Sequence, residues 1–357
     1  MRICLMAGFR FNFVLDEESD ANVAPLSTRA RGPQQSSSSS SFKLSELEVV
    51  VETFHQQLLT FISPSYHSVV LQRNTFSPLS HPSLSLPLPK TLQYVTSDTL
   101  QSLLDGGKSS GHDSNLKSGT EESVLCRLGS ELGPLLGSTD FLHSDLIPAV
   151  YEGGMKVWEC AYDLVDYLAS GDSPPLSRRR VLELGCGIGL PGIFSLLTGA
   201  EVVHFHDYNR EVLSCLTIPS ALASFVSGRP ELKSGQTGQT GILDQLADKT
   251  KFYYGDWADF VTSHCESGES PYDIILTSET IYSPSSQPKL LQALNKLTNQ
   301  STGLVVMAAK VHYFGIGGSV AMFSDLVASD GHFELSVVKN IKDTVPRVIL
   351  LLKPRNL

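Results

Sequence analysis

A glycine-rich segment in the middle of the chain has residue types and a spacing that suit the binding of a nucleotide-like ligand. A short run at 181–184, apolar except for Glu183, is followed by Gly185-Cys-Gly187-Ile-Gly189, and apolar residues then recur at helical spacing over 193–197. This pattern predicts a buried strand, a tight turn and the start of a helix. Glycines at such a turn let backbone N–H groups approach a ligand that side chains would otherwise block.

Two ligands fit this glycine loop. Gly187, Gly189 and Gly192 match the dinucleotide pattern G-x-G-x-x-G, and Asp207 follows about twenty residues later, as that pattern expects. Alternatively, Glu183 stands two residues before a G-x-G-x-G turn, which is the first motif of methyltransferases that use S-adenosylmethionine. Both ligands need close backbone approach and an acid on a ribose, so the loop alone does not distinguish them.

Apolar runs alternate with helical patterns after this loop. Strands are predicted at 181–184, 201–207, 251–256, 272–278 and 303–309, followed by a final pair at 333–338 and 347–352. Strands that alternate with helices indicate a doubly wound parallel sheet. The final pair has no helix between its strands and must be antiparallel, because a parallel crossover needs a dozen or more residues. We therefore expect an α/β, Rossmann-like class I methyltransferase fold, a seven-stranded sheet with a C-terminal antiparallel hairpin. A nicotinamide-binding domain would continue parallel.

Polar side chains follow four successive strands of this predicted sheet. In an open parallel sheet the ligand lies at the carboxyl ends of the strands. Asp207 after the second strand could bind both ribose hydroxyls, and Asp256 after the third could accept from an adenine amino group. Trp257 is available to stack on the adenine ring. Any one of these acids could instead cap a helix. The candidates at the strand ends are Gly185, Gly187, Asp207, Tyr208, Gly255, Asp256, Trp257, Ser278 and Glu279.

Length and composition place the chain among globular proteins. It has 357 residues, 41% hydrophobic content and a net charge of −10, which disfavours nucleic-acid binding and suits a basic protein partner. Six scattered cysteines without a C-x-x-C pair favour a reducing compartment and no metal. We expect four segments: a disordered N-terminus (1–42), an amphipathic helix (43–62), a low-complexity linker (63–139) and a methyltransferase domain (140–357).

Five runs of the sequence carry a more specific resemblance. Asp145-Leu-Ile-Pro-Ala-Val-Tyr-Glu-Gly-Gly-Met-Lys-Val-Trp-Glu-Cys160 resembles a signature of the histidine protein methyltransferases. So do the runs at 204–209, 255–257, 277–282 and 310–318, and the match extends over about 140–353. That family methylates the tele nitrogen of one histidine in a large-subunit ribosomal protein, with S-adenosylmethionine as cofactor. The cofactor contacts that the resemblance implies here are Val157, Trp158, Glu159, Cys160, Ala161, Gly185, His206, Asp207, Tyr208, Gly255, Asp256, Trp257 and Ser278. Glu183 and Gly187 of the glycine-loop motif are further predicted cofactor contacts.

The resemblance leads to a hypothesis for methyl transfer. A neutral imidazole already offers a lone pair at neutral pH, so the enzyme must supply positioning, the correct tautomer and a dry pocket. Glu279 and Tyr282 are placed to hydrogen-bond the opposite ring nitrogen. His312 is a third candidate for substrate orientation, although it could equally pack a loop together with Tyr313. Trp158 could cover the sulfonium, which suits an aromatic face.

Other functions stay open at this point. The first alternative is a lysine methyltransferase of the same superfamily. The second is a non-catalytic fold that escorts a ribosomal protein, and the third is a nicotinamide oxidoreductase. The intact acids Glu183, Asp207 and Asp256 weigh against the escort. We expect a monomer with a basic ribosomal protein as partner and no membrane contact. It would work in the cytoplasm and nucleus, with the nucleolus left open.

Overall fold

The structure of the protein is a computed structural model that describes residues 40–41, 67–70, 91–95, 146, 150–227 and 244–355. The helix predicted for 43–62, and most of the predicted terminus and linker, lie outside the described residues. Within the described part of the chain, no helix is long and apolar enough to span a membrane.

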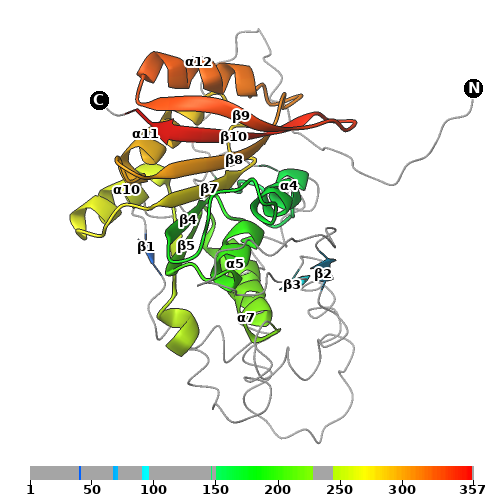
Figure 1. Cartoon of the computed structure of the whole chain (residues 1–357), viewed down its shortest axis with the longest axis vertical. Helices are drawn as coiled ribbons and strands as arrows, with labels where there is room; N and C mark the ends of the chain where they lie inside the picture. Colours follow the sequence, from blue (N-terminus) through cyan, green and yellow to red (C-terminus); the bar gives the residue numbers. More distant parts are fainter. Residues whose placement is uncertain are drawn as a thin grey trace, which may run out of the picture.

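A single mixed sheet forms the centre of the molecule (Figure 1). Five strands run parallel: β4 (Arg180–Leu184), β5 (Val202–Asp207), β6 (Thr250–Tyr254), β7 (Ile274–Ser278) and β8 (Leu304–Lys310). β10 (Arg347–Pro354) pairs antiparallel with β8, and β9 (Phe333–Ile341) pairs antiparallel with β10. The order is β1-β6-β5-β4-β7-β8-β10-β9. The predicted methyltransferase topology is confirmed, with one addition: β1 (Ser40–Ser41) pairs antiparallel with β6.

Helices cover both faces of the sheet and create two cores. One core lies under α4 (Glu159–Leu168), α5 (Leu190–Leu197), and the continuous stretch of α6 (Arg210–Val212), the π-helical η1 (Leu213–Thr217) and α7 (Ile218–Ser227). The other lies under α10 (Trp257–Glu266), α11 (Gln287–Leu297) and α12 (Val320–Asp330). The central strands β7 and β8 are largely apolar on both faces, as expected for parallel strands that helices cover on each side.

A two-stranded sheet lies within the predicted linker. It consists of β2 (His67–Val70) and β3 (Thr91–Tyr94), which pair antiparallel. Leu92, Tyr94 and Val95 are buried against the helical layer of α7. The Val95 N–H donates to the Ser220 hydroxyl over 3.0 Å, and the hydroxyls of Tyr94 and Tyr162 are 3.1 Å apart. The segment predicted as a low-complexity linker thus includes two paired strands, and the apolar residues Leu92 and Tyr94 of β3 are buried.

Candidate functional site

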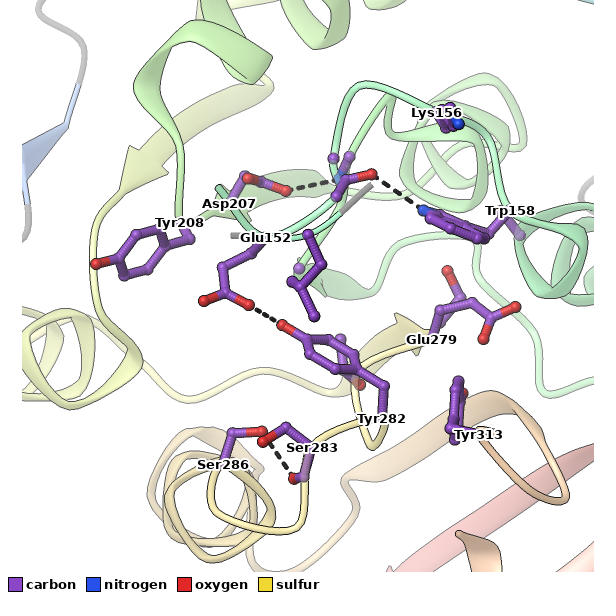
Figure 2. Close-up of a pocket in the computed structure, with 18 of the residues that line it drawn as sticks. Glu152, Lys156, Trp158, Asp207, Tyr208, Glu279, Tyr282, Ser283, Ser286 and Tyr313 are labelled. Carbon is purple, nitrogen blue, oxygen red and sulfur yellow. Dashed lines mark hydrogen bonds between the residues drawn. The ribbon is translucent and has the colours of Figure 1, made fainter. Parts of the chain in front are cut away.

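A pocket of about 730 Å³ opens at the carboxyl ends of β4, β5, β7 and β8 (Figure 2). This volume lies within the range of small-molecule sites, about 300–1,000 Å³. The pocket occupies the position where ligands bind in open parallel sheets, beside the point at which the strand order reverses. Its walls come from the segment before α4, the glycine loop after β4 and the loops after β5, β6, β7 and β8.

The glycine loop folds as its sequence predicts. Gly185, Gly187 and Gly189 have φ values of +67°, +51° and +85°, a region that side chains disfavour. A Cβ on Gly185 would lie 2.7 Å from the Thr280 methyl group, so the loop also packs closely on the segment after β7. The π-helical turn η1 supports the loop from the other side, because the Thr217 hydroxyl donates to the Gly187 carbonyl over 2.5 Å. The loop is therefore rigidly shaped for close approach of a ligand.

Asp207 ends β5 at the pocket wall and is only 5% exposed. Its carboxylate accepts from the backbone N–H of Gly187 over 2.9 Å and from that of Asn209 over 3.0 Å. Burial raises the pKa of this carboxyl to about 6, against the lowering effect of the backbone N–H groups. Asp207 thus connects the glycine loop to the end of β5 and still lines the pocket.

Asp256 follows β6 and has two protein partners. It caps α10 by accepting from the Ala258 N–H over 2.8 Å, and its other oxygen lies 2.7 Å from the Lys289 ammonium. Asp256 therefore caps α10, which is the structural function that the sequence left open for it. Asp256, Trp257 and Lys289 nevertheless line the pocket, so the carboxylate is also within its wall.

Glu279 and Lys310 form a buried charged pair at the ends of β7 and β8. The ammonium of Lys310 lies 3.2 Å from the Glu279 carboxylate and 3.1 Å from that of Glu159. It also lies 4.9 Å from the ring centroid of Trp158, within cation–π range. Glu279 has a φ of +57°, a strained value for a residue with a side chain, and such strain concentrates at functional sites.

The sequence did not single out Lys310, although it did single out its partners Glu279, Glu159 and Trp158. Lys310 begins the signature run 310–318, but a lysine at a strand end usually reaches solvent. Burial alone would lower its pKa, yet Glu279 and Glu159 raise the pKa of Lys310 above its usual value. One face of Trp158 is therefore in contact with a protein cation. The indole N–H of Trp158 donates to the Gly153 carbonyl over 3.0 Å, which holds the ring in the pocket wall (Figure 2).

Tyr282 points into the pocket and donates its hydroxyl proton to Glu152, a residue of the segment before α4. Burial, together with the charge of Glu152, raises the pKa of Tyr282. Glu152 was also missed by the sequence reasoning. The signal available was its place in the first signature run, six residues before Trp158.

His312 and Tyr313 have different environments at the mouth of the pocket. His312 is exposed and forms an isolated bridge with Ser319, while Tyr313 is buried and accepts from the Lys310 N–H over 3.3 Å. Gly318 ends this loop, and its N–H donates to the Tyr282 carbonyl over 2.8 Å. A Cβ there would lie 2.2 Å from that oxygen, so only glycine fits. The glycines at 315–318 thus shape the loop next to Tyr282.

Comparisons with known proteins place the chain in a family. A family model described as lysine methyltransferase matches residues 241–314. A mouse protein described as histidine protein methyltransferase 1 homolog is 33% identical over 269 residues, covering 74% of this chain and 72% of that protein. The chain belongs to the histidine protein methyltransferase 1 family. A cattle relative with the same description is 37% identical over 217 residues, covering 58% of this chain and 57% of its own length.

Similarity among solved structures is more distant. A crystal structure of an O-methyltransferase from Bacillus cereus in complex with SAH is 11% identical, with a TM-score of 0.37, and covers 71% of this chain and 99% of that chain.

In this member of the family, most of the cofactor contacts predicted from the sequence lie together. The predicted contacts that line the pocket are Val157, Trp158, Ala161, Gly185, Gly187, Asp207, Tyr208, Asp256, Trp257 and Ser278. The three predicted substrate-orienting residues Glu279, Tyr282 and His312 line it as well. The structure brings these residues to one site, and their individual roles stay predictions.

Five predicted contacts lie outside the pocket lining: Glu159, Cys160, Glu183, His206 and Gly255. Cys160 is fully buried. Glu183 accepts from the Gly192 N–H over 2.7 Å and so anchors the start of α5, while burial raises its pKa. The ring centroid of His206 lies 4.7 Å from that of Phe260, which belongs to the core under α10, α11 and α12. Glu159 forms an ion pair with Lys310, which itself lines the pocket. Gly255 has a φ of +117° that shapes the turn after β6.

These features fit S-adenosylmethionine. The glycine loop presents backbone where a side chain could not stand, and the buried carboxylate of Asp207 faces a cavity large enough for a nucleoside with an amino-acid tail. The residues that would hold the cofactor are the glycine loop, Asp207 and Tyr208 at the ribose, and Trp257 at the adenine ring.

Cofactor affinity should depend on pH through Asp207. Ribose hydroxyls donate to an ionised carboxylate, so the complex favours the deprotonated form, while the free protein takes up a proton near pH 6. The cofactor affinity should be constant above this pH. Below it, the affinity should decrease with falling pH, with a slope that approaches tenfold per pH unit. Calorimetric titration with S-adenosylhomocysteine between about pH 5 and 7.5 measures this, with circular dichroism as the control for folding. Equal affinity at both limits would contradict the assignment.

Proposed function

We propose that this protein transfers a methyl group from S-adenosylmethionine to the tele nitrogen of a histidine in another protein. The observation that carries the proposal is one pocket in which a glycine loop and Asp207 meet the two acceptors Glu279 and Tyr282. The family to which the chain belongs supports the reaction class. The cofactor supplies an electrophilic methyl group on sulfur.

The side chains at the pocket perform three tasks in this proposal. Asp207 and the glycine loop fix the nucleoside, which sets the direction in which the methyl group points. Trp158, Tyr313 and the loop after β8 enclose the reacting end and reduce access of water. Glu279 and Tyr282 offer oxygen acceptors to the N–H of the substrate ring, which leaves the other nitrogen as the nucleophile. A strong base is not needed, because imidazole is largely neutral at pH 7, with a pKa of about 6.5.

We propose a large-subunit ribosomal protein as the substrate. The resemblance of the signature runs suggests this class. The net charge of −10 supports it, since a basic ribosomal protein would be attracted to an acidic enzyme.

A lysine acceptor is the second candidate, and the family model described as lysine methyltransferase favours it. An ammonium group must lose a proton before it can attack, and its usual pKa is about 10.4. Glu152 and Glu279 could bind such a cation. However, both carboxylates already have partners, Tyr282 and Lys310 respectively.

The two candidates differ in the product. Purified protein is incubated with methyl-labelled S-adenosylmethionine and with large-subunit ribosomal proteins from cells that lack the corresponding gene. The labelled band is hydrolysed and its amino acids are separated. Label in tele-methylhistidine supports the proposal, and label in methyllysine replaces it with the second candidate. Absence of both label and cofactor binding would favour the non-catalytic escort.

A further inference from the structure

A hydrogen bond between Tyr282 and Glu152 joins two walls of the pocket. Glu152 belongs to the segment before α4, and Tyr282 follows β7, 130 residues later in the chain. Figure 2 shows the carboxylate of Glu152 directed at the phenol oxygen of Tyr282, between Asp207 and the loop after β7. Both residues line the pocket.

The direction of this hydrogen bond determines what Tyr282 can offer a ligand. An ionised carboxylate only accepts hydrogen bonds, whereas a phenol has one proton to donate and lone pairs that accept. Because Tyr282 donates its proton to Glu152, its oxygen can only accept from a further partner. Burial and the nearby charge raise the pKa of Tyr282, so the phenol keeps its proton at neutral pH.

Backbone contacts hold both partners in place. The Glu152 N–H donates to the Asn209 side-chain oxygen over 3.2 Å, and the Asn209 amide donates to the Val150 carbonyl over 2.8 Å. On the other side, the Tyr282 carbonyl accepts from Gly318 over 2.8 Å. The pair is therefore fixed at both ends, as a group that orients a substrate must be.

We propose that Glu152 is a positioning residue that makes Tyr282 a hydrogen-bond acceptor for the pros N–H of the substrate imidazole, and thereby selects the tele nitrogen for methylation. The inference rests on the proposed function. A neutral imidazole has one N–H and one lone pair, so an acceptor on one side places the lone pair on the other. A tyrosine free to donate could instead bind the ring nitrogen that carries the lone pair and favour the wrong tautomer.

The chemical step balances without another reactant. The tele lone pair forms the N–C bond, and the C–S bond breaks with its electron pair returning to sulfur. The ring, now an imidazolium, loses the pros proton to solvent. Tyr282 and Glu152 keep their protonation states throughout, since they only orient the ring.

Four variants test this: Glu152→Ala, Glu152→Gln, Tyr282→Phe and the double variant Glu152→Ala/Tyr282→Phe. Each is assayed on the large-subunit ribosomal proteins for kcat, KM and the ratio of tele- to pros-methylhistidine. Affinity for S-adenosylhomocysteine is measured by calorimetry. We expect Glu152→Ala to lose about 10- to 100-fold in kcat, the effect of one hydrogen bond to a charged group, and to form more pros product.

The remaining variants decide whether Glu152 acts through Tyr282. Glutamine retains an accepting oxygen, so Glu152→Gln should recover most of the rate and the tele selectivity. The double variant should be no slower than Tyr282→Phe alone, since the carboxylate has nothing left to orient. Independent losses in the double variant, or unchanged selectivity in Glu152→Ala, would overturn the inference while leaving histidine methylation intact.

Two further outcomes also count against it. If Glu152→Ala loses cofactor affinity and Tyr282→Phe does not, Glu152 is a cofactor contact and not a positioning residue. If the unmodified protein labels no histidine, the proposed function fails, and this inference fails with it.

Discussion

Replacing Asp207 by alanine should abolish methyl transfer and lower cofactor affinity by at least 10- to 100-fold. A hydrogen bond to a charged group contributes about 1.5–3 kcal/mol, and the carboxylate would make one or two with the ribose. The substitution also removes the acceptor for the N–H groups of Gly187 and Asn209. The glycine loop would lose its link to β5, which adds to the loss. Calorimetry with S-adenosylhomocysteine measures the affinity directly.

Two control variants accompany Asp207→Ala: one separates the charge of Asp207 from its structural contacts, and the other removes an acid outside the pocket. Asp207→Asn retains an oxygen that can accept from the Gly187 N–H but has no charge, so it should bind the cofactor more weakly than the parent and more tightly than Asp207→Ala. Asp248 is exposed, precedes the amino end of β6 and does not line the pocket, so Asp248→Ala should bind normally. Normal affinity in Asp207→Ala would show that the cofactor lies elsewhere.

The fold could be predicted because its signals are local. The strands β7 and β8 carry continuous apolar runs and are buried on both faces, and the missing helix between β9 and β10 determined their antiparallel pairing. The strand β3 was missed because its four residues lie among Ser- and Pro-rich sequence. Its burial depends on the surface of α7, which the local sequence does not reveal.

The sequence predicted which acidic residues line the pocket, but not which residues form ion pairs with them. The chemistry of strand ends identified Asp207, Asp256 and Glu279 as pocket residues. Which groups neutralise them depends on residues far along the chain: Lys289 lies beside Asp256, and Lys310 beside Glu279. Spacing in sequence does not encode such contacts: the register between β7 and β8 brings Lys310 to Glu279, and the placement of α11 beside α10 brings Lys289 to Asp256.

The pairing of Lys310 with Glu279 predicts the largest effect on stability. Both side chains are buried, with exposures of 7% and 8%. Replacing Lys310 by methionine keeps most of the volume but leaves a buried carboxylate without its cation. Loss of one partner of a buried ion pair typically costs about 3–5 kcal/mol. Urea denaturation of Lys310→Met at neutral pH should show a free energy of unfolding lower by this amount.

The double variant Lys310→Met/Glu279→Gln isolates the cause of that loss. A neutral amide no longer needs a cation, so the double variant should recover much of the stability, and additive losses would contradict the explanation. Lys289→Met is the matched control, since its partner Asp256 lies in an exposed pair worth about 0–1 kcal/mol. The pH dependence should agree. A lysine whose pKa is raised in the folded state contributes its stability below the unfolded pKa of about 10.4 and loses it above, so the pair should stabilise the fold throughout the neutral range.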